Sequence, residues 1–189
     1  MNRRELLKHA TLLIGASLSP AIVAGVTSTE KLHGGSKNSR LNGHQRKLIA
    51  VLSELIIPAT DTPGATDAKV PEFIDLIVSD WQTEAESAAF LDGLEAIDRY
   101  CTKHYQQDFL RCAEDQQVSA LRVFERNANT KKTQNDIQPF FLALRELVVV
   151  GYFTSEAGAT QALRHSHAFE TFIGDYPLKK VGKAWSPVY

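Results

Sequence analysis

Few residues of this chain have the types and the spacing that chemistry requires, and the clearest are its two cysteines, Cys101 and Cys112. In an oxidising compartment such a pair could form a disulfide, provided that the two Cα atoms approach within about 7 Å. Two small buried thiols that never react, or a bond to another subunit, would also account for them. The sequence leaves these alternatives open.

Histidines and carboxylates offer two weaker candidates for a metal site. His165 and His167 are two residues apart and could present two imidazoles to a metal, but no carboxylate or cysteine with ligand spacing accompanies them. We interpret them as solvent-facing side chains at a helix end. Asp61 and Asp67 flank a Pro-Gly turn without the alternating acidic residues of a calcium loop, so turn capping is the favoured interpretation.

No arrangement of residues predicts catalysis. His104, Tyr105 and Asp108 could form a general-base group, yet no nucleophile is spaced to join them, and we assign them to the surface. The chain lacks a glycine-rich phosphate fingerprint, a haem-attachment motif, a C-x-x-C pair, a nucleophile elbow and a zinc-helix motif. We therefore predict no catalytic residue, no cofactor and no metal in this chain.

The composition is that of one globular domain. The chain has 189 residues, of which 43% are hydrophobic and 23% charged, enough for a core of ordinary size. Its formal net charge is −1, and no block of like charges suggests a surface that follows phosphates. Nucleic acid is not an expected partner.

The N-terminal segment is typical of an export signal. Arg3 and Arg4 precede residues 10–26, an apolar run that contains no charged residue. The stretch NRRELLK resembles the twin-arginine signal, which a translocase reads as an address and which carries folded passengers, often with a partner attached. We predict a signal peptide over residues 1–26 and a periplasmic location; the alternative is an N-terminal membrane anchor that is not cleaved.

A Ser-, Gly- and Asn-rich linker is expected over residues 27–42, followed by one folded domain over residues 43–189. Its first helix should end before Pro58, and Pro and Gly residues over 58–71 predict a structured loop. A second helix should start at Val70 with Pro71 in its first turn. Its predicted apolar face consists of Phe73, Ile74, Ile77, Val78 and Trp81.

Three longer helical patterns and one short one follow. Thr83 and Glu86 predict a capping box for the third helix, and Glu114 the start of the fourth. The fifth, opened by Asp136 and Pro139, is apolar on nearly every face, which places it in the middle of the bundle or beneath a partner subunit. Thr154 or Ser155 should cap a short sixth helix. We predict an all-α, single-domain bundle of about five to six helices.

The C-terminal residues predict an extended tail, because glycines and prolines recur there. Its aromatic side chains are too apolar to leave in water, so the tail should lie along its own surface or that of another chain. They are Phe169, Phe172, Tyr176, Trp185 and Tyr189.

Two stretches, LIAVLSELIIPATDTPGATDAKVPEFIDLIVSDW and GYFTSEAGATQALRH, resemble the gluconate 2-dehydrogenase subunit 3 family over residues 45–165. The resemblance implies a small accessory subunit bound to an FAD-containing catalytic subunit of the glucose-methanol-choline (GMC) type, sometimes with a multihaem cytochrome c subunit. The FAD would belong to the partner. It also implies a non-catalytic role, in which the subunit escorts the flavoprotein through export and stabilises it in a periplasmic or membrane-associated complex.

Under this resemblance the patterned loops and the tail become the candidate partner interface. The residues are Pro58, Asp61, Pro63, Gly64, Tyr152, Phe153, Thr154, Phe172, Tyr176 and Trp185. The competing interpretation is that these loops only build caps and turns. If Gly64 uses a positive φ, its replacement by valine should damage the turn. The alternative function is a stand-alone exported helical binding module.

Overall fold

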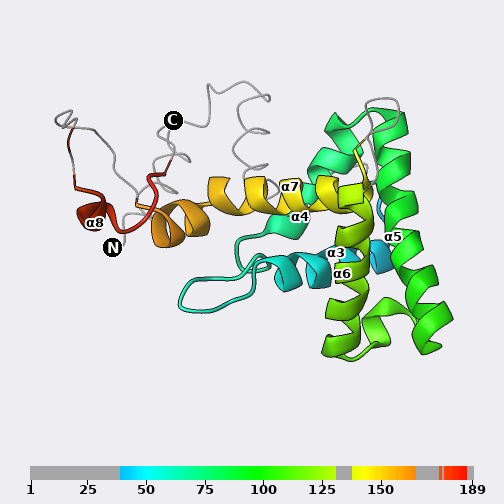
Figure 1. Cartoon of the computed structure of the whole chain (residues 1–189). Helices are drawn as coiled ribbons and strands as arrows, with labels where there is room; N and C mark the ends of the chain where they lie inside the picture. The colour runs from blue at the N-terminus through cyan, green and yellow to red at the C-terminus, as the bar shows by residue number, and fades with distance from the viewer. Residues whose placement is uncertain (1–38, 131–137, 165–174, 176, 187–189) are drawn as a thin grey trace, which may run out of the picture. The chain divides into compact units, whose positions relative to one another are not determined.

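The computed structural model describes residues 39–130, 138–164, 175 and 177–186 (Figure 1). Contacts divide the chain between Gly34 and Gly35, and every described residue lies in the second part. The described residues form six α-helices, with short 3-10 and π segments between them. Over the described ranges the sole β-type pairing is an isolated bridge between Arg164 and Trp185. The predicted all-α class is confirmed.

Helix α3 spans Gly43–Ile56 and begins with a capping box that our sequence analysis did not identify. Asn42 Oδ1 accepts a hydrogen bond from the Gln45 amide, and Gln45 Oε1 accepts one from the Asn42 amide, both at 2.9 Å. These bonds satisfy two amides at the helix start. The helix ends before Pro58, as predicted, and buries Leu48, Ile49 and Leu52.

Helix α4 spans Val70–Leu76 and continues as the π-helical segment η2, Ile77–Trp81. Pro71 lies in the first turn, as predicted. Ile74 and Val78 are fully buried, but the placement of Trp81 on the apolar face is wrong, because its side chain is 76% exposed. A π turn contains more residues than an α turn, so the next side chain that faces the core comes after residue 81. The side-chain oxygen of Gln82 is buried in place of the Trp81 ring.

Helix α5 spans Glu84–Tyr105, and the predicted capping box of Thr83 and Glu86 is present. The helix ends at Gln106, whose φ of 59° turns the chain back. The 3-10 segment η3, Phe109–Arg111, then leads into helix α6, Glu114–Thr130, which starts at the predicted residue.

Helix α7, Phe140–Thr154, is the central helix of the described domain, as predicted. It contacts α3, α4, α5 and α6 (Figure 1). Glycines allow its closest approaches: a Cβ at position 151 would lie 2.6 Å from Cδ1 of Phe73, and one at position 93 would overlap the Phe140 ring. Asp136, the expected start signal, lies outside the described residues.

The chain after α7 is short and irregular where it is described. Ser155 Oγ accepts a hydrogen bond from the Gly158 amide at 3.0 Å just before the π segment η4, Gly158–Ala162, whose own N-cap residue, Ala157, makes no side-chain capping bond. Helix α8 has four residues, Leu178–Val181. Among the helices of the described ranges, none has the length and hydrophobicity needed to cross a membrane.

Candidate partner-binding site

The Pro- and Gly-rich loop between α3 and α4 is held by one carboxylate, that of Glu54. Its Oε1 accepts a hydrogen bond from the Ala59 amide at 2.9 Å, and its Oε2 accepts one from the Thr66 amide at 3.0 Å. Burial alone would raise the pKa of Glu54, but the hydrogen bonds from Thr66 and Ala59 outweigh it and hold that pKa below the ordinary value. The loop is therefore structured, as predicted.

Gly64 lies against this carboxylate, and the expected reason for a glycine there is wrong. Among the described glycines only Gly182 has a positive φ. A Cβ on Gly64 would instead overlap Glu54 Oε1 and lie 2.7 Å from the Ala59 amide nitrogen. Space for the carboxylate, and not backbone conformation, requires a glycine at this position.

Tyr152 joins the loop to the central helix. Its hydroxyl donates a hydrogen bond to the Pro63 carbonyl at 2.7 Å and lies 3.4 Å from Thr62 Oγ1. The side chain is only 2% exposed, and its ring packs edge-on against Phe153. The two patterned stretches of the sequence thus meet here, although about ninety residues separate them.

The structure sorts the predicted interface residues of these two stretches into buried and accessible ones. Gly64 and Tyr152 are buried, and Pro63 and Phe153 are partly buried. These four serve the packing of the loop. Pro58, Asp61 and Thr154 are exposed, so only these three remain available to a partner.

Four large apolar side chains on α4, η2 and α7 are exposed, those of Leu76, Trp81, Val149 and Val150; we call these four residues the apolar seam. Phe73 of α4 packs against Gly151 of α7. Gln82, which follows η2, lines a groove of about 330 Å³ together with Ala143 and Glu146 of α7. Sequence reasoning missed the seam because it assigned Trp81 to the core.

Trp185 packs on its own chain. The Arg164 guanidinium lies 4.5 Å from the centre of its ring, a cation-π contact. Backbone hydrogen bonds support this contact: the Arg164 amide donates to Ala184 at 2.7 Å, and the Ser186 amide donates to Arg164 at 3.0 Å. The ring remains partly exposed. The other predicted tail residues, Phe172 and Tyr176, lie outside the described residues.

The residues considered for catalysis take separate structural roles. The His104 ring lies against Tyr100, with their centroids 4.3 Å apart. Asp108 caps η3 and forms an ion pair with Arg111 at 3.3 Å. The described residues contain no group of three His, Cys, Asp or Glu side chains that could hold a metal. Arg3, Arg4, His165 and His167 lie outside the described ranges.

A groove of about 350 Å³ between α3 and α4 is lined by residues that include Arg46, Lys47, Glu72 and Asp75. The buried Asp75 carboxylate accepts hydrogen bonds from Ser39 Oγ at 2.6 Å and Ser79 Oγ at 3.1 Å, and lies 3.8 Å from Arg46. These contacts occupy the carboxylate. They join α3, α4 and the segment before α3, so Asp75 serves the fold.

Comparison with known proteins gives one family. Residues 43–170 match the family described as Gluconate 2-dehydrogenase subunit 3. No curated protein and no solved structure matches the chain. The matched region contains the loop held by Glu54, the apolar seam and Tyr152.

Replacing Gly64 by alanine is expected to lower the free energy of unfolding by about 1–3 kcal/mol, because the new methyl group forces the Glu54 carboxylate or the loop to move. Urea unfolding followed by circular dichroism measures the change. Gly43→Ala is the matched control, since nothing lies within 4 Å of a Cβ at that position. Equal stabilities of the two variants would contradict the crowding argument.

Proposed function

We propose, on the premise that this chain belongs to the gluconate 2-dehydrogenase subunit 3 family, that it is a non-catalytic subunit that binds and stabilises the catalytic flavoprotein of a sugar or polyol dehydrogenase. The family is that of an accessory subunit of a dehydrogenase complex, which implies association with other subunits. The FAD, in a catalytic subunit of the GMC type, belongs to the partner. A multihaem cytochrome c subunit would accept the electrons.

The apolar seam is the observation that carries this proposal. Trp81 is 76% exposed, and Leu76 on α4 and Val149 and Val150 on α7 are also exposed. Single apolar side chains are normal on a protein surface, but tryptophan is enriched at protein interfaces. Tryptophan is also the residue that most often dominates the binding energy of protein complexes.

The exposed loop residues Pro58 and Asp61 and the exposed Thr154 would contribute polar contacts at the edge of such an interface. The loop is preorganised, because Glu54 and Tyr152 hold it in the free subunit. Preorganisation lowers the entropy that binding must offset. Trp185 is a second candidate anchor, held on the tail by Arg164.

Export escort is the second part of the proposal. The pattern of Arg3 and Arg4 before an uncharged apolar run is that of a twin-arginine signal, whose translocase carries folded passengers. A catalytic subunit that binds this chain in the cytoplasm would cross to the periplasm with it. The substrate stays open, because specificity would reside in the partner's pocket.

Purification of the tagged chain from its native host tests the function directly. We expect a flavin absorption spectrum in the eluate and a GMC-type dehydrogenase among the peptides identified by mass spectrometry. A colourless single protein, recovered at both low and high salt, would contradict the subunit role. It would favour a stand-alone helical binding module.

Trp81→Ser should raise the dissociation constant for the catalytic subunit at least about thirty-fold, because an interface tryptophan contributes about 2 kcal/mol or more. Titration calorimetry of the purified subunits measures this change. Trp185→Ser tests the second candidate anchor in the same assay, an exposed tryptophan that also contacts its own chain. If only Trp185→Ser weakened binding, the tail and not the seam would be the interface.

Changing Arg3 and Arg4 together to lysine should leave both this chain and the catalytic subunit in the cytoplasm, because the twin-arginine receptor reads the arginine pair. Dehydrogenase activity in periplasmic and cytoplasmic fractions is the measurement. The control replaces Arg122 and Arg126, both exposed on α6, by lysine, and should leave the distribution unchanged. Full periplasmic activity in the Arg3 and Arg4 variant would contradict the escort role.

A further inference from the structure

The two cysteines of the chain, Cys101 and Cys112, belong to different elements that pack against each other. Cys101 is on α5, and Cys112 follows η3 after the chain has turned back at Gln106. Both thiols are free and buried, with exposed fractions of 0% and 6%. The segment η3 packs against α5, and Cys112 is close enough to contribute to the raised pKa of Cys101.

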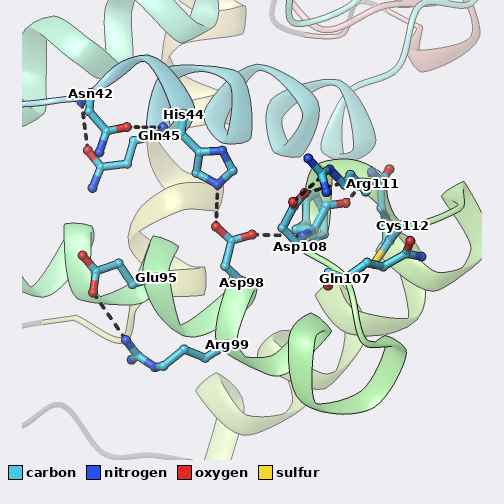
Figure 2. A network of polar contacts seen from close by, with 12 residues as sticks. Asn42, His44, Gln45, Glu95, Asp98, Arg99, Gln107, Asp108, Arg111 and Cys112 are labelled. Atoms are coloured by element: carbon cyan, nitrogen blue, oxygen red, sulfur yellow. Dashed lines mark hydrogen bonds and ion pairs between the residues drawn. The ribbon is translucent and has the colours of Figure 1, made fainter.

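Several contacts fix the segment that carries Cys112 against α5. The Phe109 amide donates to Asp98 Oδ1 at 3.0 Å, and Gln117 Nε2 donates to the Phe109 carbonyl at 2.9 Å. The second oxygen of Asp98 lies 2.6 Å from His44 of α3, as Figure 2 shows. The Phe109 ring is fully buried. The packing of α3, α5 and η3 therefore fixes the segments that carry the two thiols.

Neither thiol serves another contact that would explain the pair. Cys112 Sγ has only a long contact of 4.0 Å to the Gln107 carbonyl (Figure 2), and no metal-binding group exists among the described residues. Burial, with Cys112, Asp98 and Asp108 nearby, raises the pKa of Cys101 to about 12. Cys101 is therefore a neutral thiol at neutral pH and not an activated nucleophile.

We propose that Cys101 and Cys112 form an intrachain disulfide when the folded chain meets a disulfide donor, such as oxidised glutathione or the active-site disulfide of a thiol oxidoreductase. The packing of η3 on α5, held by the hydrogen bond from the Phe109 amide to Asp98, brings the segments that carry the two thiols together. This inference is independent of the partner subunit and holds for the chain alone.

The exchange proceeds in two balanced steps that begin at Cys112, the thiol with residual exposure. Cys112 loses its proton and attacks the donor disulfide, which gives a mixed disulfide and releases one donor thiol. Cys101 then attacks the Cys112 sulfur and gives its proton to the departing donor thiolate, which closes the bond and releases the second donor thiol. The donor is reduced by two electrons and the two protein thiols are oxidised by two.

The disulfide would tie the end of α5 to η3 through a loop of about a dozen residues. Cross-linking such a loop restricts the unfolded chain and stabilises the folded one. For a protein of this size the chain-entropy argument predicts a rise in Tm of about 5–10 °C on oxidation.

The test uses the full chain, incubated with oxidised glutathione and then denatured for thiol titration. We expect two titratable thiols before treatment and none after it, a peptide that links Cys101 to Cys112 in a non-reducing digest, and the rise in Tm stated above. Two remaining thiols, or linkage between chains only, would overturn the proposal. So would a cross-linked form that melts no higher than the reduced form.

Single substitutions test the order of the steps. Cys101→Ser should accumulate a mixed disulfide with glutathione at Cys112, whereas Cys112→Ser should leave the fully buried Cys101 unmodified in the folded protein. Modification of Cys101 alone would overturn the order. The double serine variant is the control, and dithiothreitol should not change its Tm. The thiol titration of the unaltered chain stands even if a variant fails to fold.

Discussion

Burial of helix α7 is the constraint on which the rest of the described domain depends. The helix is apolar on nearly every face, so the hydrophobic effect can be satisfied only if other elements surround it. Helices α3, α4, α5 and α6 do so, and Gly93 and Gly151 allow two of the closest contacts. The cover is incomplete at Val149 and Val150, which remain exposed. The same helix thus organises the core and contributes to the apolar seam.

Polar groups decide how the connections lie on this core. Glu54 and Tyr152 hold the loop before α4, Asp75 joins α4 to α3, and Asp98 joins α5 to η3 and α3. The three carboxylates accept hydrogen bonds from donors on other segments, and the Tyr152 hydroxyl donates one to the Pro63 carbonyl. A hydrogen-bonding group that is left unpaired at a buried or half-buried position destabilises the folded state. Each of these contacts therefore favours one conformation of the connecting segment. The loop and the thiol pair are therefore built features of the domain.

The proposed function depends on the exposed residues that these polar contacts do not involve. His104 and Asp108, which could have served as a general base, are engaged in a ring contact and in capping and an ion pair, respectively. The feature that such contacts do not account for is the exposed apolar seam around Trp81. An accessory subunit that binds through this seam, next to a preorganised loop, fits both observations and the family to which the chain belongs.

Local signals in the sequence were enough to determine the all-α class, the capping box at Thr83, the start of α6 at Glu114 and the central place of α7, because periodicity and capping act over a few residues. Trp81 could not be placed, since the π turn that exposes it is not visible in apolar spacing. The role of Gly64 depends on Glu54, and that of Tyr152 on Pro63. The meeting of Cys101 and Cys112 depends on Asp98 and Phe109. These are contacts between separate segments, and only tertiary packing decides them.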